Sequence, residues 1–294
     1  MKLVTYLYEG REAAGVLSPD GTEIYPAKAL GFACENMNGW IDVLAGEGLS
    51  ALKRAVGRGC EEAVALDQVT LLAPIPEPKQ DMICLGINYM AHAEESARYA
   101  EESFGGERPY AVYFSKRVGE AVRPEGEIDG HFDMVERLDY EVELAVVIGK
   151  DAKGVPKEKA ADYILGYTII NDVSARVIQS RHKQWYFGKS LDGFTPMGPW
   201  IVTADEFSFP PRLAIQSKVN GELRQDSNTE LLIFGVDHVI EELSKGMTLK
   251  AGTVIATGTP AGAGMGFEPP QFLKTGDTVE CIIEGIGTLK NTVK

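Results

Sequence analysis

Residues Leu138–Lys150 read Leu-Asp-Tyr-Glu-Val-Glu-Leu-Ala-Val-Val-Ile-Gly-Lys, and this stretch decides the fold. Its second half is apolar, is rich in β-branched residues and ends at Gly149, which predicts a strand entering a core. Because successive strand side chains point to opposite faces, Glu141 and Glu143 share one face. The other members alternate in the same way, with Ala145 and Val147 on the face of the glutamates and with Tyr140, Val142, Leu144 and Val146 opposite.

Two carboxylates side by side on a strand repel each other, and burying them without a partner costs free energy. A positive charge is therefore expected between Glu141 and Glu143. A hard divalent cation such as Mg²⁺ or Mn²⁺ fits, because carboxylate oxygens are its preferred ligands. The alternative is an edge strand on which both glutamates are solvated.

Length and composition indicate a globular protein. The 294 residues suffice for one large or two modest domains, and 44% of them are hydrophobic and 24% charged. A net charge of −14 argues against a nucleic-acid partner, because the sequence offers phosphates no basic stripe. An anionic substrate gains nothing from this overall charge, so local cations must hold it.

The cysteine spacing and the N-terminus indicate the compartment. No CxxC or Cys/His ligand pattern connects the four cysteines, which are Cys34, Cys60, Cys84 and Cys281. This usage fits the reducing cytoplasm. Residues 1–6 show no signal-peptide pattern, and no apolar run approaches the roughly 18 residues of a membrane span. We therefore expect a soluble cytoplasmic protein with no membrane partner.

Residues 1–72 are predicted to form a small N-terminal α+β domain, with a strand at Lys2–Tyr8 and a helix at Trp40–Val56. This domain has no constellation of chemically reactive residues, so we expect a structural or interface role for it. The Pro-rich link Ala73–Pro78 separates it from residues 80–294, the expected catalytic domain.

The rest of the chain is predicted to be a mostly-β core with a few helices, an α+β class. Strands are expected at Met82–Leu85, Tyr110–Ser115, Tyr163–Ile170, Trp200–Thr203, Leu213–Val219, Thr253–Ala256, Thr278–Ile283 and Gly287–Val293, and helices at Val173–Gln184 and Leu231–Leu243. Arg98–Phe132, rich in charge, Gly and Pro, is expected to form either a lid over a site or an ordinary excursion.

A histidine and a glutamate stand three residues apart just after the turn Gly86–Tyr89. If this segment is helical, His92 and Glu95 are neighbours on one face. Such a pair suits general-base catalysis, because the carboxylate fixes the imidazole tautomer. The alternative is a solvated surface pair.

Asp172 stands at the tip of a predicted core strand, where it can serve as a third carboxylate ligand. Arg176 follows four residues later, with Gln179 beyond it, and a guanidinium there can grip a substrate carboxylate through two hydrogen bonds. The alternative for Arg176 is a salt bridge to Asp172.

Two glycine-rich loops complete the candidate site. Phe187–Phe194 carries Lys189 and lacks the spacing of a phosphate-binding P-loop. Thr257–Gly264 can place backbone N–H groups and the Thr259 hydroxyl against an anionic ligand.

Taken together, five segments resemble the fumarylacetoacetate hydrolase superfamily, in family order and over about residues 80–294. They are Cys84–Tyr89 followed by His92–Glu95; Asp139–Leu144; Gly166–Tyr167 through Asn171–Arg176; Gly188–Ser190; and Thr257–Gly262. Residues 1–72 resemble the small domain that precedes the core in longer prokaryotic-type members.

The resemblance implies a rolled β-sheet core, a homodimer and a bound Mg²⁺, with Mn²⁺ or Ca²⁺ as alternatives. It assigns Glu141, Glu143 and Asp172 to the metal, His92 and Glu95 to a water-activating dyad, Lys189 to stabilising negative charge, and Arg176, Gln179 and Thr259 to the substrate. Full hydrolases carry a further metal-binding aspartate before the histidine, and Cys84–Ala91 has no counterpart. This departure fits acylpyruvate-type members better.

We therefore expect a metal-dependent hydrolase that cleaves a C–C bond in a 1,3-dioxo acid, giving pyruvate or a similar 2-oxo acid and a second acid. Decarboxylation of oxaloacetate and isomerisation of a dienoate are the alternatives that use the same metal and enolate. A non-catalytic protein that binds metal and oxo acid is the alternative of another class. We expect substrate identity to depend on Arg98–Phe132 and Lys183–Tyr186.

Overall fold

The computed structural model describes residues 1–100 and 110–294. The stretch that decides the fold forms two strands, β9 (Leu138–Asp139) and β10 (Val142–Ile148). Tyr140 and Glu141 lie between them, so the predicted strand is confirmed from Val142 onward and interrupted before it.

The predicted alternation along β10 is confirmed. Leu144 and Val146 enter one core cluster, whereas Ala145 and Val147 enter another on the opposite face. β10 is a central strand, paired with β11 on one side and with β16 on the other. The alternative of an edge strand with solvated glutamates is therefore wrong, and Glu143 is only 1% exposed.

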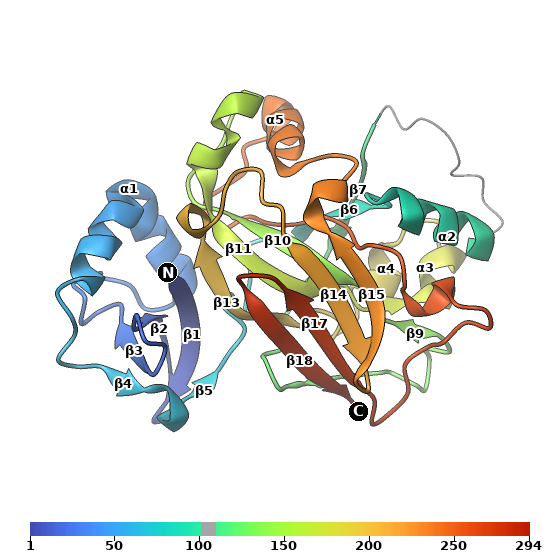
Figure 1. Cartoon of the computed structure of the whole chain (residues 1–294), viewed down its shortest axis with the longest axis horizontal. Helices are drawn as coiled ribbons and strands as arrows, with labels where there is room; N and C mark the ends of the chain where they lie inside the picture. The colour runs from blue at the N-terminus through green and yellow to red at the C-terminus, as the bar shows by residue number, and fades with distance from the viewer. Residues whose placement is uncertain (101–109) are drawn as a thin grey trace.

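A long sheet crosses the molecule in the order β4-β3-β2-β1-β13-β11-β10-β16-β6-β7, with β5 beside β1 (Figure 1). Its strands are β1 (Lys2–Tyr8), β2 (Arg11–Leu17), β3 (Glu23–Pro26), β4 (Val64–Ala65), β5 (Thr70–Leu71), β6 (Met82–Gly86), β7 (Val112–Lys116), β10, β11 (Ile164–Asn171), β13 (Met197–Thr203) and β16 (Val254–Ala256). The pairing of β16 with β6 is parallel.

A second sheet, ordered β15-β14-β17-β18-β8, packs on the first (Figure 1). Its strands are β8 (Glu127–Ile128), β14 (Ala214–Val219), β15 (Glu222–Asn228), β17 (Thr278–Ile283) and β18 (Gly287–Val293). Apolar side chains of β10, β11, β14, β17 and β18 form one buried cluster. Burying this apolar area between the two sheets is the main source of stability. The predicted mostly-β α+β class is confirmed.

The α-helices lie around these sheets. They are α1 (Met37–Val56), α2 (Met90–Ala100), α3 (Arg176–Arg181), α4 (Tyr186–Lys189) and α5 (Val236–Gly246), and 3₁₀ turns occur at Leu66–Gln68, Lys157–Tyr163, Ala204–Glu206, Thr229–Leu231 and Gly264–Gly266. Among the described residues, none of these helices has the length and apolar composition that crossing a membrane requires.

Two predicted helices begin later than expected. The helix expected from Val173 begins at Arg176, because Ser174 and Ala175 form β12 and pair with β9. The helix expected from Leu231 begins at Val236. The Asn228 side chain accepts a hydrogen bond from the Glu230 N–H at 2.9 Å, which caps a separate 3₁₀ turn there.

The N-terminal segment joins the large sheet. The strand predicted at Lys2–Tyr8 is confirmed, and it pairs with β13 of the second part of the chain. Helix α1 packs its buried Trp40 on the sheet face that carries Ala145. The division into domains at residues 72 and 80 stays a prediction.

Candidate active site

Three carboxylates meet where β10 begins and the antiparallel β11 ends. Val142 pairs with Asn171 in the register of these strands, so the acids on either side become neighbours. Glu141, Glu143 and Asp172 are buried, and one carboxylate oxygen from each lies within 4.8 Å of the others. The Asp172 N–H donates to the Glu141 carbonyl at 2.8 Å, which fixes the two backbones together.

Buried cations contact two of these acids. Lys189 Nζ donates to Glu141 Oε2 at 2.8 Å and to Asp172 Oδ2 at 2.6 Å. Lys116 Nζ donates to Asp172 Oδ1 at 2.7 Å. Glu143 differs, because its partner is the Gly258 N–H, which donates to Oε2 at 2.8 Å.

The electrostatics of the two glutamates are opposite in sign. Burial alone raises the pKa of Glu141, but Lys189 and Arg176 more than offset it and hold that pKa well below its ordinary value. Burial, followed by the charges of Asp172 and Glu141, raises the pKa of Glu143 well above its ordinary value. Within residues 1–100 and 110–294, Glu143 is therefore the acid of this group that has no ion-paired cation.

The donor set fits a divalent cation. Among the described residues, four carboxylates stand against three cations in this buried cluster, namely Asp139, Glu141, Glu143 and Asp172 against Lys116, Arg176 and Lys189. A hard divalent ion takes carboxylate oxygens and supplies the missing positive charge. The three acids predicted from sequence as metal ligands are thus brought together, and their assignment as ligands remains a prediction.

The predicted His–Glu pair lies on α2. His92 Nδ1 is 3.5 Å from Glu95 Oε2, and His92 is only 5% exposed. The Gly262 N–H donates to Glu95 Oε1 at 2.9 Å and orients that carboxylate. Asn88 holds the turn before α2, since its side-chain amide donates to the Thr257 carbonyl at 2.9 Å. The alternative of a solvated surface pair is wrong.

Arg176 does not pair with Asp172, so that alternative is wrong as well. Its Nε donates to Asp139 Oδ2 at 2.9 Å, and its Nη2 is 2.6 Å from Glu141 Oε1. Its Nη1 donates to Gln179 Oε1 at 3.2 Å. The guanidinium is thus held by side chains of the protein itself.

The loop Thr257–Gly264 was expected to face an anionic ligand with backbone N–H groups. In the structure those N–H groups donate hydrogen bonds to carboxylates of the chain itself. Gly258 donates to Glu143, Gly262 to Glu95 and Gly264 to Asp139. The Thr259 hydroxyl donates to the Val142 carbonyl at 2.9 Å and accepts from Gln225 Nε2 at 2.7 Å. The loop therefore orients the site acids.

A cavity of ≈ 640 Å³ joins these groups. Glu141 and Glu143, His92, Arg176, Gln179, Lys189 and Thr259 all line it. Lys183 and Trp185 form part of its wall. Of the lid predicted over residues 98–132, residues 101–109 lie outside the described part of the chain.

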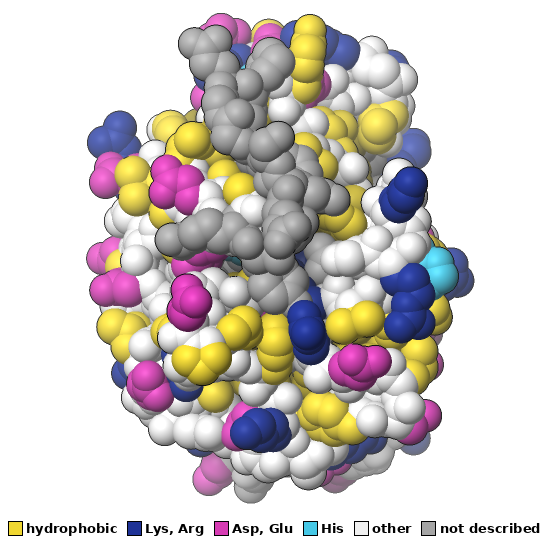
Figure 2. Space-filling view, turned by 90° about the vertical axis from the view of Figure 1, so that its right-hand side faces the viewer, with side chains coloured by type: hydrophobic (Ala, Val, Ile, Leu, Met, Phe, Trp, Pro, Cys, Tyr) yellow, Lys and Arg dark blue, Asp and Glu magenta, His cyan; other side chains and the backbone are white. Residues whose placement is uncertain are grey.

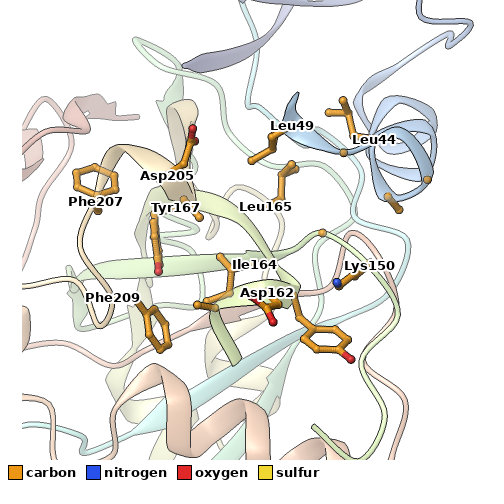
Figure 3. Close-up of a pocket in the computed structure, with 17 residues that line it drawn as sticks. Leu44, Leu49, Lys150, Asp162, Ile164, Leu165, Tyr167, Asp205, Phe207 and Phe209 are labelled. Atoms are coloured by element: carbon orange, nitrogen blue, oxygen red, sulfur yellow. The ribbon is translucent and has the colours of Figure 1, made fainter. Parts of the chain in front are cut away.

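A second cavity, of ≈ 480 Å³, lies between α1 and the start of β11 (Figure 3). Leu44 and Leu49 of α1 face it, with Phe207 on its other side. Asp205, one of the carboxylates that line it, is paired with Lys53. Of the three grouped acids of the described residues, Glu141 and Glu143 line the first cavity, so that cavity is the candidate active site.

Sequence reasoning missed Lys116 and Asp139. Asp139 is spaced two residues from Glu141, which is the same signal that paired Glu141 with Glu143. Lys116 ends a strand, β7, that was predicted only to Ser115, and its partner Asp172 is distant in sequence.

Replacing Lys116 with methionine is expected to lower the free energy of unfolding by about 3 kcal/mol, because it breaks a buried ion pair and leaves Asp172 short of a donor. Chemical denaturation measures this change. Arg117→Gln is the matched control, since Arg117 is exposed and 3.9 Å from Asp81, and it should change stability by about 0.5 kcal/mol or less. Equal stability of wild type and Lys116→Met would contradict the role of this lysine.

The family model "Fumarylacetoacetate (FAA) hydrolase C-terminal" matches residues 81–294. The chain belongs to the fumarylacetoacetate hydrolase family. The resemblance inferred from the sequence segments is thus confirmed.

The proteins to which this chain is similar are named for different reactions. Oxaloacetate tautomerase YisK of Bacillus subtilis (strain 168) is 46% identical over 229 residues, which are 78% of this chain and 74% of that protein. Fumarylacetoacetate hydrolase from Exiguobacterium antarcticum is 39% identical with a TM-score of 0.82, covering 100% of this chain and 99% of that chain. Maleylpyruvate hydrolase from Sphingobium sp. SYK-6, in complex with manganese(II) and pyruvate, is 30% identical with a TM-score of 0.77, covering 100% and 98%.

Proposed function

We propose that this protein interconverts the keto and enol forms of a small 2-oxo acid, with oxaloacetate as the representative substrate. The observation that carries the proposal is the position of His92, which lines the cavity beside the acid cluster and has Glu95 behind its Nδ1. Keto–enol exchange needs one group that moves a proton between carbon and oxygen, and a histidine oriented by a carboxylate suits that task.

Glu141, Glu143 and Asp172 would hold the divalent cation, for which we propose Mg²⁺, with Mn²⁺ or Ca²⁺ as alternatives. When bound, such an ion supplies positive charge that polarises the 2-oxo group of the substrate. Manganese in the maleylpyruvate hydrolase structure supports a divalent ion in this family.

The chain's own residues perform the proton transfer. With Nδ1 of His92 facing Glu95, Nε2 is the nitrogen left for the substrate. In the enol-to-keto direction the imidazole takes the proton of the enol O–H and delivers a proton to C3, so that one O–H bond breaks and one C–H bond forms. The carboxylate of Glu95, held by the Gly262 N–H, stabilises the intervening imidazolium.

Hydrolysis of an acylpyruvate, the reaction expected from the sequence, is the second candidate. The same His92–Glu95 dyad can take a proton from water, and the maleylpyruvate hydrolase relative supports this reaction. Hydrolysis also needs a donor for the oxyanion of the attacked carbonyl. Lys189, the residue expected to serve there, is hydrogen-bonded to Glu141 and Asp172, which favours proton transfer over hydrolysis.

The test is a substrate panel with Mg²⁺ or Mn²⁺: oxaloacetate prepared as the enol, acetylpyruvate and fumarylpyruvate. We expect faster loss of the enol absorbance of oxaloacetate with no release of CO₂, and loss of that acceleration in EDTA. Cleavage of a diketo acid without enol exchange would replace the proposal by the hydrolase. Release of CO₂ would indicate the decarboxylase, and metal binding without turnover would indicate a binding protein.

A further inference from the structure

Among the described residues that line the cavity, one cation differs in kind from the others. Arg176 and Lys189 are buried and held by carboxylates. Lys183 also lines the cavity but is exposed. Within residues 1–100 and 110–294, no carboxylate of the chain pairs with the Lys183 ammonium, so it is free to meet a ligand.

The charge balance of the site leaves a second substrate carboxylate without a cation. The buried cluster has one carboxylate more than it has cations, so a divalent ion leaves it with one net positive charge. That charge balances the carboxylate at the 2-oxo end of a substrate. A second carboxylate on the same molecule needs another cation, because a desolvated carboxylate without a partner is costly.

The overall field of the protein does not supply that cation. The net charge is −14, and the face that carries α2 and α3 shows acidic and basic side chains intermixed (Figure 2). A dicarboxylate is therefore repelled at long range and must be recognised by a local charge.

The backbone presents Lys183 at the cavity. Trp185 packs edge-on against Phe114, with ring centroids 5.2 Å apart. It also covers Gly86 so closely that a Cβ there would lie 2.1 Å from the Trp185 ring. Lys183 itself has φ of 61°, a conformation that costs a non-glycine residue free energy and that collects at ligand sites. The segment is thus docked on the cavity wall with its lysine at the opening.

We propose that Lys183 binds the distal carboxylate of the substrate and selects dicarboxylic over monocarboxylic 2-oxo acids. This inference rests on the proposed function, because it names the class of 2-oxo acid that the same cavity accepts.

The test measures binding, so that it does not depend on turnover. Malate and 2-hydroxybutanoate share a 2-hydroxy carboxylate and differ only in whether the chain ends in a carboxylate or a methyl group. Calorimetric titration of each into the Mn²⁺-loaded protein compares their affinities. We expect tighter binding of malate, and a loss of about fivefold to tenfold in malate affinity in Lys183→Gln, with 2-hydroxybutanoate unchanged.

Two control variants sharpen this comparison. Lys183→Arg keeps the charge and should retain the preference for malate. Arg181→Gln removes an exposed positive charge two residues away that does not line the cavity, and it should leave both affinities unchanged. The preference should also weaken as salt is raised, because Lys183 is exposed.

Equal loss for both ligands in Lys183→Gln, or an intact malate preference, would overturn the inference. A failed enol-exchange assay together with a malate preference that depends on Lys183 would reject the proposed function and leave the dicarboxylate site standing. If the protein exchanged the enol of oxaloacetate at the same rate and the same KM with and without the Lys183 side chain, the proposed function would stand and the dicarboxylate site would be rejected.

Discussion

Replacing Glu143 with glutamine is expected to stabilise the metal-free protein by about 1–2 kcal/mol and to lower its affinity for Mg²⁺ or Mn²⁺ by about 100-fold or more. The two effects have one cause. Glu143 is buried beside two other acids, and no cation of the described residues forms an ion pair with it, so its carboxylate is costly without a bound ion and necessary for binding one. Thermal unfolding in EDTA and with added metal measures both effects.

The pH dependence of this stabilisation has a definite sign. The pKa of Glu143 is raised in the folded protein above its ordinary value of 4.5. Below pH 4.5 the carboxyl group is protonated in both states, so wild type and Glu143→Gln should differ little. Above it the unfolded wild-type chain ionises while the folded state resists ionisation, so wild type loses stability relative to the variant.

Glu141→Gln is the matched control, with the opposite expected sign. Glu141 contacts Lys189 and Arg176, and neutralising it leaves two buried cations short of a partner. We expect this variant to lose about 3 kcal/mol in EDTA and also to lose metal binding. A Glu143→Gln variant that gains as much thermal stability from Mg²⁺ as the wild type does, at the same Mg²⁺ concentrations, would show that the ion binds elsewhere.

The opposite effects expected for Glu141 and Glu143 separate what the sequence could predict from what it could not. The position of each acid was predictable, and its cation was not. The two-residue spacing placed Glu141 and Glu143 on one face, and the strand end placed Asp172 near them. The identity of the cations could not follow in the same way. Lys116 reaches Asp172 across 56 positions and Arg176 reaches Asp139 across 37, so only the pairing of distant strands decides which acid each cation serves.

The sequence also could not predict which groups accept hydrogen bonds from the backbone N–H donors of the site. The glycine-rich loop Thr257–Gly264 was predicted to place backbone N–H groups against an anionic ligand, and the N–H groups of Gly258 and Gly262 do bind anions. The anions are side chains of the protein, because the loop follows β16, next to β10, and its N–H groups reach Glu143 and Glu95. A pattern of glycines indicates close approach but not the approaching partner.

Replacing His92 with alanine is expected to lower kcat for enol exchange by about 10²–10⁴-fold while metal affinity is kept. His92 is the member of the dyad that lines the cavity and lies on α2, whereas the acids that gather for the metal lie around the start of β10 and just after β11. Stopped-flow loss of enol absorbance gives kcat, and calorimetry gives the metal affinity. Added imidazole should restore part of the rate, because a small base can occupy the space that the side chain leaves.

His238→Ala is the matched control for this variant. His238 Nε2 lies 3.5 Å from Glu242 Oε2 on α5, so the chain contains a second His–Glu pair at the same separation but away from the cavity lining. Its removal should leave kcat unchanged. If His92→Ala kept the wild-type rate, or if lost activity came with lost metal and no rescue by imidazole, His92 would be a structural residue of α2. The arrangement of α2, which brings His92 to the cavity and Glu95 to the Gly262 N–H, would then serve the packing of the helix and not proton transfer.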